Sequence, residues 1–122
     1  MQPEDVLKQY ETRINLHVFD DLAPLISDEA VFWFSDGSHS GIDEIRAAFE
    51  QTWNNIQDEA YWLEGLKWIA KGDRTASCTY SFHWKEMSGD NPASGNGRGT
   101  TVLRKEADAW KIIHEHLSPS TK

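Results

Sequence analysis

The clearest indication of how this chain folds lies in the run Trp110-Lys111-Ile112-Ile113-His114-Glu115-His116-Leu117-Ser118. Its aromatic and β-branched residues favour an extended strand. Side chains alternate between the two faces of a sheet, so Trp110 and Ile112 are expected on one side. Ile113 and Leu117 are then expected on the other side. Since both sides carry large apolar side chains, both faces of this strand should be covered.

Three similar strand-like runs precede this one, at residues 61–71, 74–86 and 98–106. They are separated by turn signals at Gly72-Asp73, at a Gly/Asn/Ser-rich loop over residues 89–97, and at Ala107-Asp108. Short connections between consecutive strands require antiparallel pairing. The second half of the chain is therefore predicted to form a four-stranded antiparallel meander.

The first half has the apolar spacing of helices. Pro3, followed by Glu4 and Asp5, suits a helix start. An apolar stripe then continues to residue 18. A short helical turn is expected at residues 22–26, followed by a short strand at 30–34 that ends at the turn signal Asp36-Gly37. A second long helix is expected to begin with a capping-box-like sequence at residues 40–43 and to end near residues 54–55. This order predicts one α+β domain over residues 1–122, with about three helices over a curved sheet.

The helices of so short a chain can cover only one face of the sheet. On the run 74–86, Tyr80 and Phe82 face one way, whereas Ser81 and His83 face the other way. The run 61–71 carries large apolar residues on both sides. An uncovered face of this kind is rare in monomers, so we expect a homodimer that pairs sheet to sheet.

Composition excludes several classes of partner. The chain has 122 residues and a formal net charge of −8, and its 12 basic residues are scattered among 20 acidic ones. A nucleic-acid binder needs clustered Lys and Arg, so neither nucleic acid nor an anionic membrane is an expected partner. The only cysteine, Cys78, cannot form an intramolecular disulfide. With an acidic start in place of a signal peptide, a cytoplasmic location is expected.

The order of elements resembles the cone-shaped, cystatin-like fold of the nuclear transport factor 2-like superfamily. The likeness is closest to its SnoaL-like and kinase association (hub) domain branches, and it covers nearly the whole chain. It rests on the closing run 110–118 and on Gly41-Ile42-Asp43 followed by Phe49-Glu50-Gln51-Thr52-Trp53. The resemblance implies an interior pocket. Hub domains hold inward arginines there, whereas the roughly matching positions here are Ser81, Thr101 and Leu117.

Two residues are candidates for acid–base chemistry. Glu115 shares a strand side with Ile113 and Leu117, which the resemblance implies is the pocket side. Apolar surroundings would raise the pKa of its carboxyl toward a range suited to proton transfer. The alternative is a structural ion pair with a neighbouring basic residue. His39 lies in a turn near Asp36, where an acid–base pair competes with ordinary turn chemistry.

Six further residues are candidates for the pocket wall or its polar anchors. Helical phase and resemblance place Trp53 at the wall, and Tyr10 lies on the apolar stripe of the first helix. The other candidates are His83 or Tyr80, depending on which side of their strand faces inward, and Trp33 or Phe34. For Trp53 and Tyr10 the alternative is ordinary core packing. His114 and His116 share a strand side, but a metal site needs a third ligand that the sequence does not supply.

These observations lead to three interpretations of function. The first is a homodimeric domain that binds a small hydrophobic or aromatic molecule in an interior aromatic pocket. The second, implied by the resemblance, is a cofactor-free isomerase, cyclase or hydrolase that uses Glu115 or His39. The third is a non-catalytic assembly domain. No cofactor is expected in any of them.

Overall fold

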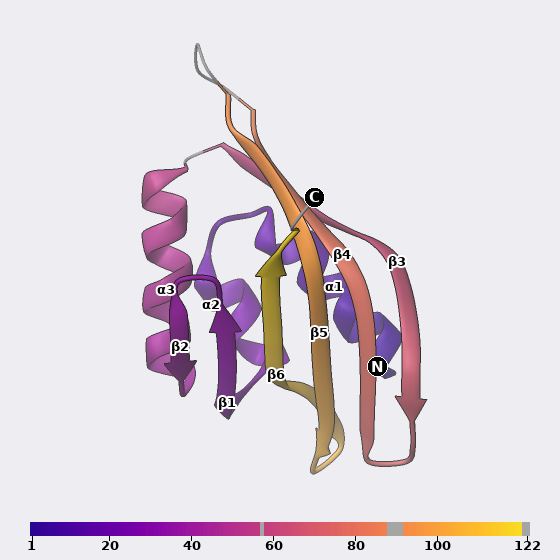
Figure 1. Cartoon of the computed structure of the whole chain (residues 1–122). Coiled ribbons are helices and arrows are strands. Elements are labelled where there is room, and N and C mark those ends of the chain that lie inside the picture. The colour runs from indigo at the N-terminus through magenta and orange to yellow at the C-terminus, as the bar shows by residue number, and fades with distance from the viewer. Residues whose placement is uncertain (57, 88–91, 121–122) are drawn as a thin grey trace.

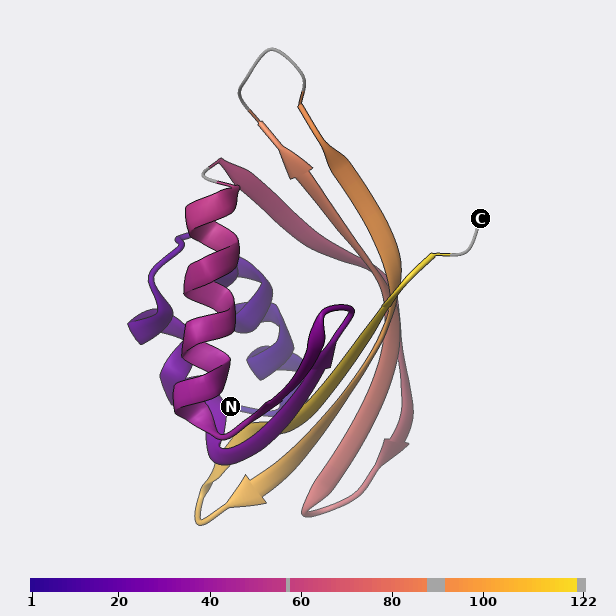
Figure 2. The same cartoon turned by 60° about the vertical axis from the view of Figure 1, so that its left-hand side comes forward.

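The computed structural model describes residues 1–56, 58–87 and 92–120 of the chain. The helices are α1 (Pro3–Ile14), α2 (Phe19–Leu22), the 3-10 turn η1 (Ala23–Leu25) and α3 (Ile42–Asn55). The strands are β1 (Ile26–Phe34), β2 (Gly37–Ser40), β3 (Glu59–Lys71), β4 (Thr75–Glu86), β5 (Ser94–Glu106) and β6 (Ala109–Pro119). The strands form one curved sheet, and the helices lie on its hollow side (Figures 1 and 2). The predicted α+β class, with helices over a curved sheet, is confirmed.

The strands are ordered β2-β1-β6-β5-β4-β3 across the sheet. From β3 to β6 each strand pairs antiparallel with the next, as the meander prediction requires. The sheet as a whole is mixed, because β1 pairs parallel with β6. Strand β2, which the sequence pattern does not predict, folds back on β1 through a tight turn, with Phe34 opposite Gly37. Helix α3 packs over β1 and β2, and α1 packs over β3 and β6.

A β-bulge in β6 changes which of its residues face inward. Val102 opposes His114 while the adjacent Leu103 opposes Ile112, so Ile113 is an extra residue. The prediction that Trp110 and Ile112 face away from Glu115 is therefore wrong. Trp110 and Ile112 are buried in the core on the hollow side of the sheet, and Glu115 is buried on that same side. Strict alternation fails here because the bulge inserts one residue between the two halves of the strand.

Helix α1 begins as predicted but is shorter. The Asp5 carboxylate accepts a hydrogen bond from the Gln2 backbone N–H, and the side chains of Val6, Leu7 and Tyr10 are buried. The helix ends at Ile14 because the Asn15 side chain bonds to the backbone of Tyr61 in both directions, at 2.9 and 2.7 Å. This contact fixes the end of α1 against β3 and prevents the helix from continuing to residue 18.

Helix α3 starts one residue later than the predicted capping box. Gly41 is its N-cap with a φ of +86°, a conformation that glycine adopts without strain. The Glu44 carboxylate, rather than Asp43, accepts a hydrogen bond from the Ser40 backbone N–H at 2.7 Å. Ile45, Phe49 and Trp53 form the buried face of the helix, as their spacing predicts.

Strand β5 begins within the segment predicted to be a loop. Part of that loop, residues 88–91, lies outside the described residues, but Ser94 to Glu106 is extended. Three glycines on its inward side, Gly95, Gly97 and Gly99, lie directly opposite Trp84, Phe82 and Tyr80 of β4. A Cβ atom on any of the three would come within 2.6 Å of the opposite ring. These glycines therefore let the aromatic rings of β4 lie flat over β5.

The convex side of the sheet carries large apolar side chains without cover from the helices. Trp33 is 47% exposed on this side, and Trp62 stacks on His83 on the same side. Trp33 packs edge-on against His114 and His116, with ring centroids 5.0 and 5.4 Å away. Over the described parts of the chain, none of the helices has the length and apolar character needed to cross a membrane.

Candidate functional site

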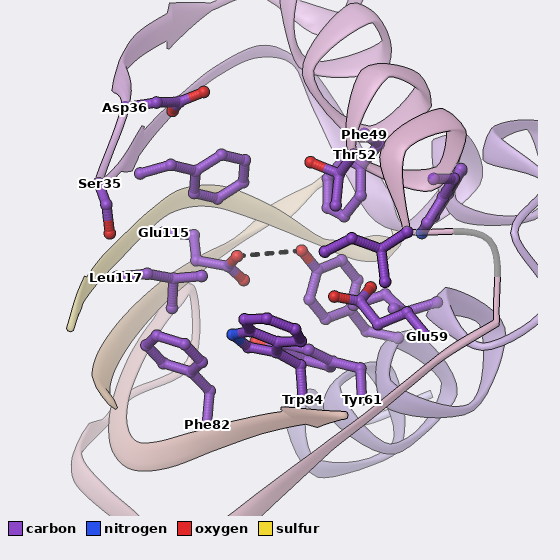
Figure 3. A pocket seen from close by; sticks show the side chains of 15 residues that line it. Ser35, Asp36, Phe49, Thr52, Glu59, Tyr61, Phe82, Trp84, Glu115 and Leu117 are labelled. Carbon is purple, nitrogen blue, oxygen red and sulfur yellow. Dashed lines mark hydrogen bonds between the residues drawn. The ribbon is translucent and has the colours of Figure 1, made fainter. Parts of the chain in front are cut away.

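A cavity of about 300 Å³ lies between the hollow side of the sheet and helices α1 and α3 (Figure 3). Its walls come from both halves of the chain: Tyr10, Ile14, Phe34, Ser35, Asp36, Phe49, Thr52, Trp53, Ile56, Glu59, Tyr61, Phe82, Trp84, Glu115 and Leu117. A volume of this size is within the range of small-molecule sites. The curvature of the sheet and the flat rings over β5 leave this space open.

Seven of the fifteen residues that line the cavity are aromatic. Phe49 lies 5.4 Å from Trp53 and 5.8 Å from Phe34 between ring centroids, so α3 and β1 share one aromatic wall. Across the cavity, Tyr61 of β3 stacks on Phe82 of β4 at 6.3 Å. Rings of this kind present large, rigid apolar faces to a ligand.

Glu115 is the deepest polar group of the site. Its side chain is 1% exposed, and Oε1 accepts a hydrogen bond of 3.1 Å from the Tyr10 hydroxyl. Oε2 is also buried and has no hydrogen-bond partner among the described residues. Figure 3 shows this carboxyl surrounded by the aromatic rings and Leu117. A buried acceptor without a partner is uncommon in proteins and indicates a place for a ligand atom, a proton or a water molecule.

Burial raises the pKa of Glu115 to about 8, even though the hydroxyls of Tyr10 and Tyr80 act to lower it. The charged form loses its hydration in this apolar site and gains too few hydrogen bonds in return. At neutral pH the carboxyl is therefore mostly protonated. It can donate a proton to a bound molecule or, once ionised, accept one.

Glu59 provides a second carboxyl at the cavity. It is the first residue of β3, is half-buried, and has a pKa raised by burial to about 7. His17 bonds to its backbone carbonyl at 3.0 Å and stacks on the Trp53 ring. Since the pKa of Glu59 lies near neutrality, this group also changes charge in the physiological range.

The lining residues carry a one-sided set of charges. Three of them are acidic, Asp36, Glu59 and Glu115, and the described lining includes no Lys, Arg or His. Two histidines contact this set from outside the described lining: His17 at the Glu59 carbonyl, and His39, whose Nε2 lies 3.3 Å from Asp36 Oδ1. Asp36 is exposed, so this pair lies at the solvent side of the cavity.

Of the eight residues proposed from the sequence, four line the cavity: Tyr10, Phe34, Trp53 and Glu115. Tyr80 faces inward but lies beneath the wall, where its hydroxyl and that of Thr101 are hydrogen-bonded at 2.7 Å. His39 packs against the Phe34 ring and is not part of the described lining.

The structure does not bring His83 or Trp33 to the cavity. His83 stacks on Trp62 on the convex side, because the alternate residues Tyr80 and Phe82 take the inward positions of β4. Trp33 lies on the convex side because Phe32 and the cavity-lining Phe34 occupy the inward positions of β1. His83 and Trp33 therefore both lie on the convex side and do not face the pocket.

Sequence reasoning missed Glu59, Tyr61, Phe82 and Trp84 as cavity residues. Tyr61 and Trp84 lie opposite each other where β3 and β4 begin to separate from the helices, a pairing that depends on strand register. Glu59 gave no signal, since an acidic residue before a strand is ordinarily solvated. Among the described residues, no three His, Cys, Asp or Glu side chains are grouped in a way that could hold a metal ion.

Several solved structures superpose on this chain over nearly its whole length. A proposed dehydratase of the nuclear transport factor 2-like family from Streptomyces avermitilis superposes with a TM-score of 0.85 at 18% identity, covering 99% of this chain and 95% of that one. A proposed calcium/calmodulin-dependent protein kinase II association domain from Xanthomonas campestris superposes with a TM-score of 0.83 at 15% identity, covering 96% of this chain and 84% of that one. A protein of unknown function with a cystatin-like fold from Nostoc punctiforme superposes with a TM-score of 0.84 at 12% identity, covering 98% of this chain and 89% of that one.

These identities are low, so the superpositions demonstrate a shared fold and not a shared activity. No curated protein matches the chain by sequence. The family model for the SnoaL-like domain matches residues 4–122, which is nearly the whole chain. This chain belongs to the SnoaL-like domain family, as its closing strand and its order of elements indicated.

Proposed function

We propose that this protein binds a small, mainly apolar or aromatic molecule in the interior cavity and acts as a homodimer. One observation carries the first part of the proposal: an aromatic cavity of about 300 Å³ surrounds a buried carboxyl that has one unpartnered oxygen. A well-packed core leaves neither a space of this size nor an unsatisfied acceptor. Such a combination is typical of a ligand site.

The binding proposal can be tested with 2-naphthol, a neutral fluorescent probe. Trp53 and Trp84 line the cavity, so a bound naphthol should quench their fluorescence. The variant Leu117→Trp fills the cavity and should abolish the quenching. The matched control is Leu16→Trp, which makes the same change at an exposed position outside the sheet. Equal quenching in both variants, or none in the unmodified protein, would contradict the proposal.

A second candidate function is cofactor-free acid–base catalysis, favoured by the pKa of about 8 at Glu115. A carboxyl with a pKa near the working pH is an efficient proton donor and acceptor. The Tyr10 hydroxyl would orient the carboxyl and stabilise its anion. If this function holds, Glu115→Gln should abolish turnover of a substrate that it still binds. The third interpretation, an assembly domain, predicts that no ligand binds and that only convex-side variants matter.

Self-association is supported by the convex side of the sheet. Trp33 is exposed there and Trp62 stacks on His83 there, whereas the described helices all lie on the opposite side (Figure 2). A second copy is the simplest cover, because a two-fold axis lets the same apolar patch cover itself on both molecules. The dimer would leave the cavity and its opening untouched, since they lie on the hollow side.

A further inference from the structure

We propose that the ligand is an organic cation: an amine, protonated in solution, with an apolar or aromatic body, held by an ammonium N–H donor to Glu115 Oε2. This inference rests on the proposed function, since it names the chemical class of ligand for the same cavity. It follows from three observations, namely the charges of the lining, the unpartnered oxygen and the aromatic walls.

The lining discriminates against anions. Asp36, Glu59 and Glu115 can each carry negative charge, and no basic side chain is among the described lining residues. An anionic ligand would be repelled by each of these carboxyls that is ionised, most strongly at pH 8 and above, where Glu115 itself ionises. A neutral apolar ligand would avoid that repulsion but leave Glu115 Oε2 without a hydrogen bond. A cation is not repelled by the carboxylates, and its N–H group can donate a hydrogen bond to Glu115 Oε2.

The position of Glu115 suits an ammonium group. Tyr10 donates to Oε1, whereas the buried Oε2 has no hydrogen-bond partner among the described residues, because the nearby Tyr80 hydroxyl is hydrogen-bonded with Thr101. A charge-assisted N–H···O bond is stronger than a neutral one and offsets the burial of both charges. Glu59 adds a second acidic group to the same cavity lining.

The aromatic walls favour the same class of ligand. Trp53, Tyr61 and Trp84 present rings to the cavity, and ring faces attract cations, most strongly for tryptophan. The same rings would pack against the apolar body of the amine. Aromatic rings arranged around an acidic group are a recurrent way of binding ammonium ions.

The inference predicts that binding releases a proton. The free protein holds Glu115 mostly protonated at pH 7, because its pKa is about 8. A bound ammonium favours the ionised carboxylate and so lowers this pKa. The other titratable groups facing Glu115 are Tyr10 from α1, Tyr61 from β3, and Tyr80 and Cys78 from β4.

None of those four groups competes for the proton. Burial raises the pKa of all three tyrosines above their usual value, and that of Cys78 to about 12. Strand β1 contributes the apolar Phe32 opposite Glu115, and β5 contributes Thr101. Glu59, with a pKa of about 7, is the other group that titrates in this range, and its ionisation also favours a cation.

The test uses three probes of nearly equal shape: 2-phenylethylamine, 2-phenylethanol and phenylacetate. Each is titrated into the protein at pH 8, with calorimetry and tryptophan fluorescence as readouts. The amine should bind about tenfold more tightly than the alcohol, and the acid should bind most weakly. Between pH 7 and 9 the ionised fraction of Glu115 rises from about one tenth to about nine tenths, so amine affinity should rise about tenfold. Calorimetry in two buffers of different ionisation enthalpy should show the proton release.

Two variants separate a local effect from the overall charge. Glu115→Gln should remove the preference for the amine and keep the affinity for the alcohol. Glu50→Gln makes the same change of net charge at an exposed position on α3 and should leave both affinities unchanged. Equal loss of amine binding in both variants would overturn the inference.

The unmodified protein alone provides a decisive result even if Glu115→Gln does not fold. Binding of 2-phenylethanol as tightly as the amine would overturn the cation assignment and leave the proposed function intact. Failure of all three probes at millimolar concentration would overturn both. Amine binding that weakens between pH 7 and 8 would also overturn the inference, because the sign of the proton linkage would be wrong.

Discussion

At the scale of single residues, the site depends on Glu115 and on the one-residue bulge that precedes it. If β6 paired without the bulge, with Ile113 taking a regular place in the ladder, Glu115 would lie on the opposite side from Ile112 and would point to the convex side. With it, the carboxyl is buried beneath Tyr10 and faces aromatic rings. The bulge therefore brings Glu115 to the inward side, where unbroken alternation from Ile112 would place His114 and His116.

The raised pKa of Glu115 makes stability depend on pH. In the unfolded chain the carboxyl has an ordinary pKa near 4.5, whereas in the folded chain its pKa is about 8. Between these values the folded state binds the extra proton, so the stability from this group is full below pH 4.5 and is lost as pH rises through 8. Glu115→Gln should remove this dependence. The free energy of unfolding that Glu115 contributes changes by several kcal/mol in total between the two pKa values.

Urea unfolding at pH 5, 6.5 and 8 measures this effect. Glu59 contributes a smaller slope of the same sign up to about pH 7, because burial raises its pKa as well. Glu50→Gln serves as the control and should follow the unmodified protein at all three pH values. A variant Glu115→Gln that loses stability in parallel with the unmodified protein would contradict a buried, mostly protonated Glu115.

Removing the hydroxyl of Tyr10 should destabilise the protein and raise the pKa of Glu115 further. Tyr10→Phe leaves Oε1 without its donor, and a buried acceptor that loses its partner costs about 1–3 kcal/mol. Chemical denaturation at pH 8 measures the loss, and the titration of the carboxyl measures the shift. An unchanged midpoint of unfolding together with an unchanged pKa would show that this hydrogen bond is absent.

At the scale of secondary-structure elements, β5 determines how deep the cavity is. Its inward positions from Gly95 to Gly99 are glycines, and the rings of β4 lie over them. A strand with no inward side chains leaves room for rings on its neighbour and for empty space above them. The loop-like composition of this segment thus has a structural role in a strand.

Gly97→Ala should therefore be poorly tolerated. Its Cβ would lie 2.1 Å from the Ser118 backbone oxygen and 2.6 Å from the Phe82 ring, so both β6 and the cavity wall would have to move. Overpacking of this kind costs about 1–3 kcal/mol or more. Gly72→Ala is the matched control, because its nearest neighbour is 3.6 Å away. Thermal unfolding of both variants should show a loss only for Gly97→Ala.

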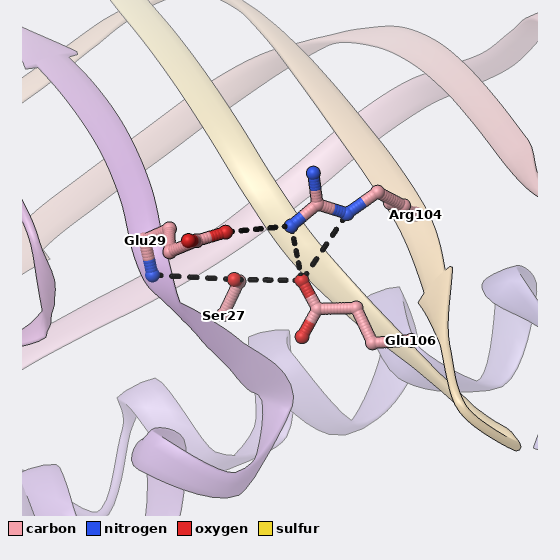
Figure 4. Close-up of polar contacts among 4 residues, drawn as sticks. All are labelled: Ser27, Glu29, Arg104 and Glu106. Atoms are coloured by element: carbon pink, nitrogen blue, oxygen red, sulfur yellow. Dashed lines mark hydrogen bonds and ion pairs between the residues drawn. The ribbon is translucent and has the colours of Figure 1, made fainter.

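Strand β1 illustrates what the sequence could not indicate. It joins the sheet parallel to β6, and polar groups connect it across β6 to β5 (Figure 4). Ser27 donates to Glu106 Oε2 at 2.8 Å, and the Arg104 guanidinium bonds to both Glu106 and Glu29. Ser27 and Glu106 lie 79 positions apart in sequence, and Glu29 and Arg104 lie 75 apart. No local pattern specifies such a pairing.

The predictability of the other elements follows from the range of the interactions that form them. Helices α1 and α3 and the meander arise from local periodicity and short turns, and these were predicted with small errors at the ends. The extra strand β2 depends on pairing with β1, and the end of α1 depends on Asn15 reaching β3. In the site, Trp53 and Glu115 were found by phase and resemblance. Glu59 and Trp84 were not, because strand register brings them to the cavity.

At the scale of the whole molecule, the two sides of the sheet have different roles. The hollow side encloses the cavity, and the convex side exposes Trp33 between His114 and His116. Strand β6 contributes Glu115 to one side and these two histidines to the other. A homodimer built on the convex side would thus be connected to the cavity through a single strand.

Charge on the convex side should prevent self-association. Trp33→Arg places a cation within the apolar patch, so two copies would bring like charges together. Sedimentation velocity at micromolar concentration should show a dimer for the unmodified protein and a monomer for Trp33→Arg. Leu16→Arg, at an exposed site outside the sheet, should remain dimeric. A monomeric unmodified protein would contradict the proposed dimer.

The central claim is that a desolvated, ligand-accessible carboxyl lies inside the molecule. Carbon-13 NMR titration of the Glu115 side chain, assigned by its loss in Glu115→Gln, tests this claim most directly. The account predicts a midpoint of about 8 in the free protein and a lower midpoint when 2-phenylethylamine is bound. A midpoint near 4.5 that the amine leaves unchanged would contradict the account, because Glu115 would then be solvated or ion-paired and would not bind the amine.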